Sequence, residues 1–558
     1  MFIRTKKRAN GKIAVQIVET IRRGKTVNQK VIRHIGQGCT EEEVEALKDL
    51  AKMVMNNIKL ERQPLLPFFS PEDLTRGKKL KKENQDNEKK LTVELDNIRE
   101  EQRVITGIKD IFENLFNELN NGKLIKGGRK TEQWNKILCD CVLARIANPQ
   151  SKKRTASLLE RDYGIKISLE KIYRMMDHLA AEESSIKKII ASQTRSLLGQ
   201  KVNVLFFDVT TLYFESFEPD GLREFGFSKD NKFKETQITL ALVATTEGLP
   251  ITYKIFPGNT CEGKTLLDMA EELKSDYNIN EILIVADRAM FTKANLETMD
   301  KLGIKYIVAA KLKSLPKNIK EEILSENYSL EEIKAKEKIS FLCKEYEYNN
   351  RRLIVSYNEK RANKDKEDRK RLIERLLKKV KNGRVKLGDL IQNRGSKKYI
   401  KIRQDEAVVN EEKIQEDALW DGLHGIITNC KTKSAKELLD RYASLWQIEA
   451  AFRISKHDLK MRPIYHWTEP RIKAHICLCF IAYSLIKQAL YRLKTIKQIS
   501  LSFEQLREEL LHVQASIVTD IKTNRFYVIP SQYTVMQGKI YQAFGLKRNT
   551  VPYELLKK

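Results

Sequence analysis

The chain has 558 residues, and 41% of them are hydrophobic, which is enough for several domains with buried cores. This composition excludes a wholly disordered chain, a collagen-like chain and a small disulfide-rich protein. A formal charge of +28 favours a polyanionic partner, most often nucleic acid, although an AT-rich genome would enrich Lys without any such function.

Neither export nor membrane insertion is expected. No apolar stretch reaches the roughly 18 residues of a membrane helix, and the longest, residues 474–486, contains His475. The first residues lack the apolar segment of a signal peptide. The eight cysteines include no C-x-x-C pair and are typical of reduced thiols, so we expect a cytoplasmic protein.

Residues 1–70 are predicted to form a small basic β/α region that could bind DNA. The expected elements are strands around 13–17 and 27–31, a hairpin turn at 23–25 and a helix over 40–55. Thr40 is the expected N-cap of that helix, with Glu43 three residues later. Residues 71–104 are rich in charged groups and poor in apolar ones, which indicates a linker or an exposed helix.

Residues 105–200 are predicted to be helical. Within them, residues 151–179 contain two apolar-periodic segments separated by Asp162-Tyr163-Gly164, with Ser168 as the expected cap of the second. This pattern fits a DNA-binding helix-turn-helix. The second helix carries Glu170, Lys171 and Arg174. Two packed helices with charged outer faces explain the same pattern equally well.

Residues 201–312 change to a β-rich pattern. Strands are expected over 202–209, 237–245, 250–256, 281–287 and 305–310, and helices over 265–277 and 292–302. The order β-β-β-α-β-α-β predicts an α/β fold with a mixed sheet.

The remaining sequence is divided into three parts. Residues 313–430 are predicted to be a β-rich insertion, residues 431–493 to be helical, and residues 494–558 to mix helix and short strands. The expected elements are strands at 339–348, 352–357, 399–402 and 425–428, and helices at 364–381, 434–460 and 469–493. The last part could serve dimerisation or DNA contact.

One motif matches a nucleotide-binding P-loop. The segment GNTCEGKT at 258–265 satisfies G-x-x-x-x-G-K-[ST], follows an expected strand and opens an expected helix. Three features oppose this interpretation. The strand before it alternates and carries Lys254, whereas a P-loop strand is continuously apolar. Pro257 stiffens the turn, and only one helix separates the motif from the acidic strand end at Asp287. The alternative is a glycine turn with a helix cap.

A pair of acids forms the second candidate site. Asp208 and Asp287 each end an apolar strand, where a buried carboxylate is costly unless it is paired or binds a metal. Carboxylates at neighbouring strand ends are hard oxygen ligands that suit Mg²⁺ or Mn²⁺. Each could also be an ordinary strand-end cap or ion pair.

A third acid lies on the helix predicted over 434–460. Tyr442, Glu449 and Lys456 are seven residues apart and would share one helix face, with Arg453 one turn after the acid. A surface ladder of ion pairs would have the same spacing. Trp446 could stack on an unpaired base, although packing in the core is the favoured role.

These residues together resemble a DDE-type transposase of a bacterial insertion sequence, in the group with the signature Y-x2-R-x3-E-x6-K. Here Tyr442, Glu449 and Lys456 match, and Leu445 occupies the Arg position, for which Arg453 could substitute. Asp208 and Asp287 match the first two acids of the family.

The resemblance implies a ribonuclease-H-like fold over about 201–312 and 431–490, interrupted by the β-rich insertion. It implies that Asp208, Asp287 and Glu449 are the catalytic residues and bind two Mg²⁺ ions, with Mn²⁺ as a substitute and no nucleotide. The implied DNA contacts are Tyr442, Lys456, Arg453, Arg288 and Trp446.

The expected activity is cleavage of the element's ends and their joining to target DNA. The expected partners are double-stranded DNA and a second copy of the chain. The expected location is the cytoplasm of a bacterium, in association with the nucleoid. Two alternatives stay open: a P-loop ATPase acting on nucleic acid, and a non-catalytic DNA-binding relic of a transposase.

Overall fold

The computed structural model of the chain describes residues 2–8, 13–23, 26–38, 40–41, 43–45, 47–48, 51–52, 54–55, 93–126, 128–199, 204–227, 234–276, 283–286, 293–325, 342–381, 398–403 and 406–555. The chain divides into two compact units. Unit 1 is Met1–Gly107, Arg492–Ser500 and Glu508–Lys558, and unit 2 is Ile108–Tyr491 and Leu501–Arg507.

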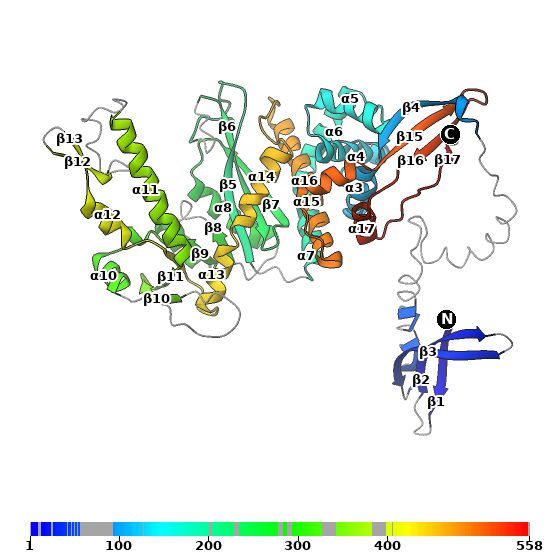
Figure 1. Cartoon of the computed structure of the whole chain (residues 1–558), viewed down its shortest axis with the longest axis horizontal. Coiled ribbons are helices and arrows are strands. Elements are labelled where there is room, and N and C mark those ends of the chain that lie inside the picture. The colour runs from blue at the N-terminus through cyan, green and yellow to red at the C-terminus, as the bar shows by residue number, and fades with distance from the viewer. Residues whose placement is uncertain are drawn as a thin grey trace. The chain divides into compact units, whose positions relative to one another are not determined.

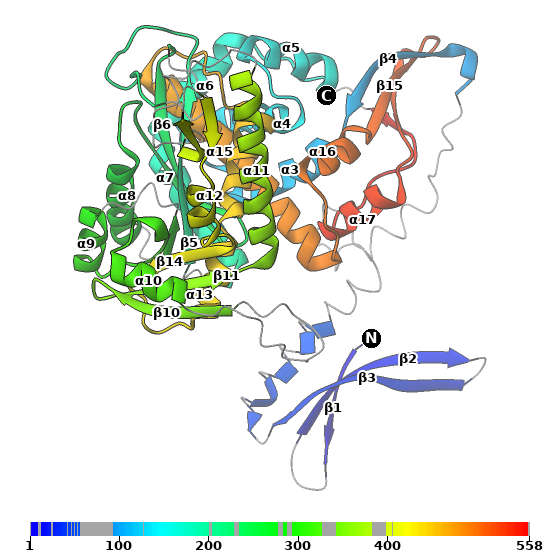
Figure 2. The ribbon, with the colours of Figure 1, turned by 60° about the vertical axis from the view of Figure 1, so that its left-hand side comes forward.

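The N-terminal part of unit 1 is a three-stranded antiparallel sheet (Figure 2). Its strands are β1 (Phe2–Lys7), β2 (Ile13–Arg23) and β3 (Thr26–Gly38). Strand β1 was not predicted, and the expected turn residues 24 and 25 lie outside the described residues. The described residues of the helix expected over 40–55 are helical, and the Glu43 amide donates to Thr40 Oγ1 as the predicted cap requires.

A second sheet in unit 1 pairs one strand from residues 98–105 with three strands near the C-terminus. Its strands are β4 (Ile98–Ile105), β15 (Gln514–Asp520), β16 (Arg525–Pro530) and β17 (Tyr553–Leu555). The order is β17-β16-β15-β4. Strand β4 falls in the segment expected to be a linker. Its charged side chains face solvent while β15 supplies the pairing, a partner that local composition cannot reveal.

The helical prediction for residues 105–200 is confirmed. The helices are α3 (Gly107–Glu118), α4 (Thr131–Ala147), α5 (Lys152–Tyr163), α6 (Leu169–Ala181) and α7 (Glu183–Leu197). Helix α5 ends at Gly164, whose φ of 67° suits a residue without a Cβ. Ser168 accepts from the Lys171 amide and caps α6 as predicted. The two helices therefore form a helix–turn–helix unit.

Unit 2 is built on one mixed sheet of eight strands. In spatial order they are β10 (Leu342–Tyr348), β11 (Arg351–Tyr357), β14 (Leu423–Thr428), β9 (Lys305–Ala309), β8 (Leu283–Ala286), β5 (Val204–Tyr213), β6 (Gln237–Thr245) and β7 (Pro250–Pro257). Strand β8 runs parallel to β5 and β9, and the other neighbours are antiparallel. The predicted mixed sheet is thus confirmed.

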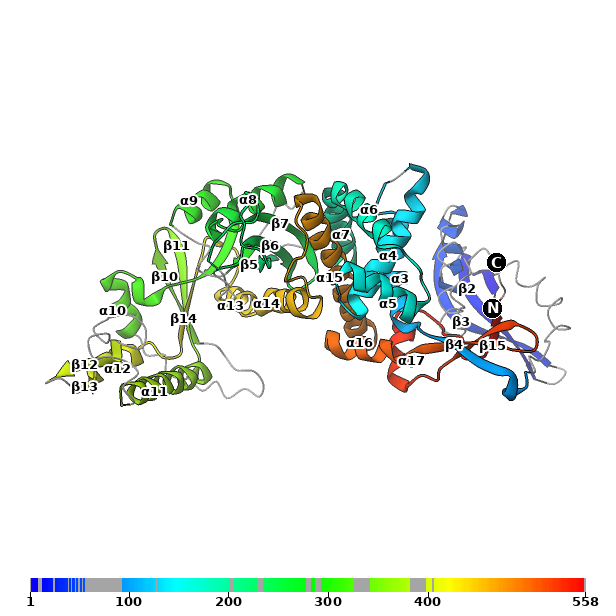
Figure 3. The same cartoon turned by 90° about the horizontal axis from the view of Figure 1, so that it is seen from above.

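The segment predicted as a β-rich insertion does not form a separate β layer. Strands β10, β11 and β14 extend the main sheet beyond β9. Among the described residues of this segment, β12 (Ile400–Arg403) and β13 (Glu406–Val409) pair apart from it, near the long charged helix α11 (Glu359–Lys381) (Figure 3). The structure also has α10 (Lys317–Ser325) and α12 (Glu411–Ala418), which were not predicted.

Helices cover both faces of the sheet. Helices α8 (Glu262–Asp276) and α9 (Lys293–Lys301) lie over one face, and α13 (Ala435–Ala443) and α14 (Trp446–Arg453) lie over the other (Figure 3). Side chains of α8 and α9, among them Leu266, Met269 and Met299, pack into the core against β5 and β6. This arrangement leaves α14 beside the strand that carries Asp208 (Figure 1).

The long helix α15 (Glu469–Lys497) is apolar and largely internal. It is long and apolar enough to cross a membrane, but 78% of its most apolar window is buried inside the protein. The expectation that no segment has that length and composition is therefore wrong for this helix. Its buried window is typical of a core helix. Helix α16 (Phe503–Leu511) and, in unit 1, α17 (Val535–Ala543) follow it.

Candidate catalytic site

Asp208 occupies the middle of the sheet. Strand β5 is buried along its length except at Asp208 and Tyr213, which are half-buried. Asp208 pairs with Leu242 on β6, and its Oδ1 accepts a hydrogen bond of 2.7 Å from the Val209 amide. The neighbouring parallel strand β8 ends at Ala286, the residue before Asp287 in the sequence. The prediction that Asp208 ends its strand is therefore wrong, because β5 continues to Tyr213, and Asp208 is the one acidic residue of this strand.

Glu449 lies on the helix that packs against this strand. Helix α14 contacts β5 and β6 and buries Ile448, Ala451 and Phe452. Glu449 lies on its exposed side. The structure therefore places the first and third predicted acids on two elements in contact, although they are 241 positions apart in the sequence.

The helix predicted over 434–460 is broken. It ends at Ala443, restarts at Trp446, and turns into a π-helical segment at Ile454–Asp458. Ser444 contributes to the break, because its hydroxyl bonds to the Asp440 carbonyl one turn earlier. The prediction of one continuous helix is therefore wrong, and Tyr442, Glu449 and Lys456 lie on three successive segments. Local π-helical turns are frequent at functional sites.

The other residues of this segment differ in exposure. Lys456 is 9% exposed, whereas Glu449 and Arg453 face solvent. Trp446 is 57% exposed, so the expected packing in the core is wrong and its indole ring is accessible. Leu445, in the Arg position of the motif, is half-buried at the break between the helices.

Tyr442 faces a cavity of about 850 Å³. Its ring lies 5.1 Å from the ring of His424 on β14. Burial and the nearby Arg361 lower the pKa of His424 to about 4, so the imidazole is neutral near pH 7. No sequence motif marked His424, which lies in the segment expected to be a β-rich insertion.

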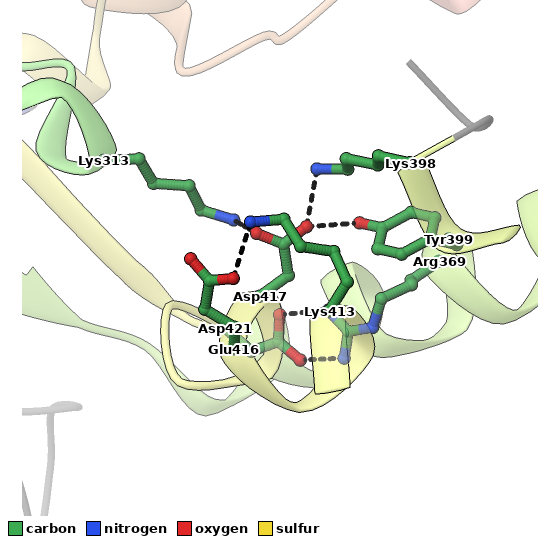
Figure 4. Close-up of polar contacts among 8 residues, drawn as sticks. All are labelled: Lys313, Arg369, Lys398, Tyr399, Lys413, Glu416, Asp417 and Asp421. Atoms are coloured by element: carbon green, nitrogen blue, oxygen red, sulfur yellow. Dashed lines mark hydrogen bonds and ion pairs between the residues drawn. The ribbon is translucent and has the colours of Figure 1, made fainter. Parts of the chain in front are cut away.

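A cluster of ion pairs lies near this cavity (Figure 4). Asp417 is buried and receives bonds from Lys313 at 2.7 Å, from Lys398 at 2.5 Å and from the Tyr399 hydroxyl at 2.8 Å. Burial alone would raise the pKa of Asp417, but these hydrogen bonds lower it well below its usual range. Asp421 pairs with Arg369 through both carboxylate oxygens. These acids are engaged in structure and are not available as metal ligands.

Two predicted site residues, Asp287 and Arg288, lie outside the described residues. Among the residues that are described, no three His, Cys, Asp or Glu side chains group as a metal site would require. The described part of the candidate site is therefore Asp208 and Glu449.

The P-loop match is explained by packing. Backbone amides of Gly258, Thr260 and Lys264 donate to carbonyls of the protein, whereas a P-loop turns its amides to phosphate. A Cβ at Gly258 would lie 2.2 Å from the Gln237 carbonyl oxygen, so close packing requires glycine there. Strand β7 before the motif is an edge strand of the sheet. The ATPase alternative is therefore not supported.

Comparison with known families follows this geometry. Residues 199–485, half of the chain, match the family model described as Transposase DDE domain. The chain belongs to the DDE transposase family. Residues 3–60 also match the N-terminal domain of IS1634 family transposases. The transposase therefore carries two parts of an insertion-sequence enzyme, and it is a metal-dependent enzyme that binds, cleaves and transfers DNA.

Solved structures give distant similarities. A piggyBac transposase synaptic complex with hairpin DNA shares 9% identity with the transposase, covers 72% of this chain and 76% of its own, and has a TM-score of 0.36. Two Mos1 transposase complexes share 14% and 12% identity with TM-scores of 0.14. They cover 32% and 35% of this chain and 57% and 71% of their own. A search of the curated proteins found no match.

Proposed function

We propose that Asp208, Asp287 and Glu449 are the catalytic carboxylates of this transposase. The observation that supports this assignment best is the packing of α14, which carries Glu449, against β5, which carries Asp208. Strand β8, next to β5, ends immediately before Asp287 in the sequence.

We also propose a ribonuclease-H-like core over residues 201–312 and 431–493. The order β7-β6-β5-β8-β9, antiparallel at first and then parallel, supports it. Residues 313–430 are then an insertion that extends the core sheet, and Glu449 returns to the core after it. Most of this proposed core, and all of the insertion, lie in unit 2 of the chain.

The acidic residues fit a divalent metal by their chemistry. Asp208 and Glu449 supply carboxylate oxygens, the hard donors that Mg²⁺ and Mn²⁺ prefer. Among the described side chains, Glu449 is exposed and Asp208 half-buried, so substrate and ion can reach both. Two bound Mg²⁺ ions would supply an activated nucleophile and stabilise the leaving oxygen. Asp208, Asp287 and Glu449 are the residues that would hold the ions.

The side chains around the acids would position DNA. Arg453 and Arg288 would pair with phosphate, Tyr442 would contact the backbone from the cavity beside β14, and Trp446 would stack on an unpaired base. Lys456 is nine-tenths buried, so its proposed role is to add positive charge behind this surface. Because transesterification conserves bond energy, none of these steps needs ATP.

The regions outside the core would bind the element's ends. We assign the basic sheet β1–β3 and the α5–α6 unit to the terminal repeats, and residues 494–558 to dimerisation or further DNA contact. Pairing two ends favours a homodimer on DNA. The expected location is the bacterial cytoplasm, at the nucleoid.

Cleavage of DNA that carries the gene's own flanking sequence tests the assignment. With Mg²⁺ and no ATP, the wild type should nick this DNA, and Asp208→Asn or Glu449→Gln should lower the rate by at least about 10³-fold. Glu215→Gln is the matched control, because Glu215 is an exposed acid seven residues after Asp208. Unchanged cleavage by Asp208→Asn would overturn the assignment.

A further inference from the structure

A second cavity, of about 430 Å³, lies where the α5–α6 unit meets the chain after the π-helical turn. The N-terminus of α5 and the end of α4 form one side. The loop from Lys460 to His466 and the start of α15 form the other. All of these elements belong to unit 2.

The lining of this cavity is strongly basic. Of the described residues that line it, none is Asp or Glu. The charged and titratable side chains are Arg145, Lys152, Lys153, Arg154, Lys460, Arg462, His466, His475, Tyr173 and Tyr465. Such a set provides hydrogen-bond donors and positive charge to the cavity.

Three of these side chains are deeply buried. Arg145, Lys152 and His475 are each 5% exposed. The Nε2 atom of His475 lies 3.1 Å from the Met461 carbonyl, which requires that nitrogen to be the N–H donor. Its Nδ1 is then an acceptor for Lys152 Nζ at 3.5 Å. The lysine ammonium is thus held by a neutral imidazole, and no carboxylate stands beside it among the described lining residues.

The buried cations are costly without an anion. Burial and the nearby Arg145 lower the pKa of Lys152 to about 7. Burial and the neighbouring cations also lower the pKa of His466 to about 3. A buried charge is normally paired within the protein. The cavity therefore has the electrostatics of a site whose anion comes from a ligand.

The ligand can be identified by its chemistry. The cavity opens at the N-terminus of α5, where the helix dipole is positive and Ser151 caps the first turn. Exposed Lys153, Arg154 and Lys460 extend the positive surface to solvent, which suits a phosphate that belongs to a longer chain.

We propose that this cavity binds one backbone phosphate of the transposase's DNA substrate, with Lys152 and Arg462 as its main contacts. The proposal rests on the proposed function only in taking DNA as the substrate. It does not depend on the identity of the catalytic acids. The cavity lies between the helix-turn-helix unit and residues 460–466, which follow Glu449 in the sequence.

The test is DNA binding by the full-length protein without divalent ions. Fluorescence anisotropy would follow a duplex from the gene's flank across a salt series. Lys152→Met with Arg462→Gln should weaken binding about tenfold and reduce the slope of log K against log salt by about one. The matched control is Lys317→Gln with Lys320→Gln on α10, which removes two charges away from the cavity.

A second measurement separates a contact from a folding effect. Replacing single phosphates of the duplex by methylphosphonates should reveal one position that weakens the wild type but not the double variant. Removing a buried charge that lacks a carboxylate should not lower the thermal midpoint of the variant. Equal salt slopes for the double variant and its control would overturn the proposal.

Inorganic phosphate distinguishes DNA from a free anion. Suppose that 10 mM phosphate raises the thermal midpoint of the wild type but not that of the double variant. Suppose also that the wild type and the double variant bind DNA with the same slope of log K against log salt. The cavity would then hold a free anion, and the DNA assignment would be wrong. The binding assay contains no divalent ion and measures no cleavage. A failure of the proposed catalytic assignment would therefore leave the binding result unchanged.

Discussion

The ring of Tyr442 packs 5.1 Å from the ring of His424, with 53° between the planes. Tyr442 begins the sequence motif of the family, and His424 lies on β14 at the end of the segment expected to be an insertion. The contact joins the motif to a strand that extends the catalytic sheet. The predicted insertion therefore packs against the segment that carries the motif.

Because the fold keeps His424 neutral, the free energy of unfolding should fall in acid. Its pKa is about 4 in the fold because of burial and Arg361, against about 6.5 in an unfolded chain. Between these values the unfolded chain binds a proton that the folded chain does not, so stability falls as pH falls from 6.5 towards 4. The urea midpoint of His424→Gln should change less between pH 7 and pH 5 than that of the wild type. Equal changes would contradict this account.

Asp417 should be a strong stabilising residue. Asp417→Asn leaves Lys313 and Lys398 without their carboxylate and should cost about 1–3 kcal/mol, measured as a lower thermal midpoint. Glu416→Gln is the control, because Glu416 is exposed and pairs only with Lys413 among the contacts drawn in Figure 4.

The pH dependence gives a second check on Asp417. Its pKa is lowered in the fold, so the stabilisation is present above the usual value of about 3.9 and is lost as pH falls through the folded pKa. The difference between the wild type and Asp417→Asn should narrow in acid. A difference in thermal midpoint between the two proteins that is as large at pH 3 as at pH 7 would contradict the stabilising role of the Asp417 carboxylate.

DNA affinity should depend on the protonation of Lys152. A phosphate binds the charged lysine, and the pKa of Lys152 is about 7 because of burial and Arg145. The affinity should therefore fall as pH rises from 6 to 9 at constant salt. The groups around it are Arg145, Lys153, Arg154, Lys460, Arg462, His466, His475, Cys141 and Cys479.

Lys152→Met provides the comparison for this pH series. The two histidines stay neutral above pH 6, because burial lowers the pKa of both. Anisotropy titrations of Lys152→Met should therefore show a flatter profile than the wild type. Parallel profiles for the two proteins would exclude Lys152 as the titrating group.

Trp446 should contribute to the binding of unpaired bases. It is 57% exposed, so Trp446→Ala should leave the thermal midpoint unchanged. Binding of a duplex with unpaired terminal bases should weaken by about 1–3 kcal/mol, while a blunt duplex should bind as before. Trp446→Phe should retain most of the affinity. An equal loss for both duplexes would rule out stacking.

Strong local patterns in the sequence predicted the fold well. Strand β6 has the predicted bounds, 237–245, because its sequence is rich in apolar and β-branched residues, and the structure buries all nine of its residues. Asp208 was found because it follows an apolar run, although it lies inside strand β5 and does not end it as predicted. The break at Ser444 and Leu445 was missed because neither residue is Gly or Pro, so the apolar pattern continues through it.

Features that depend on distant residues could not be predicted. Strand β4 pairs with β15 about 400 residues later, and its own sequence resembles an exposed linker. Lys152 and His475 are 323 positions apart, and each alone is typical of a surface lysine or a core histidine. Only the tertiary structure shows that they share a cavity.

The most direct test of the central assignment exchanges the ligand at position 208. In Asp208→Cys a thiolate replaces a carboxylate, and thiolates bind Mn²⁺ better than Mg²⁺. We predict that this variant does not cleave flanking DNA with Mg²⁺ and recovers measurable cleavage with Mn²⁺, while the wild type uses both. Cleavage by Asp208→Cys at the wild-type rate with Mg²⁺ would contradict the assignment of Asp208 as a metal ligand.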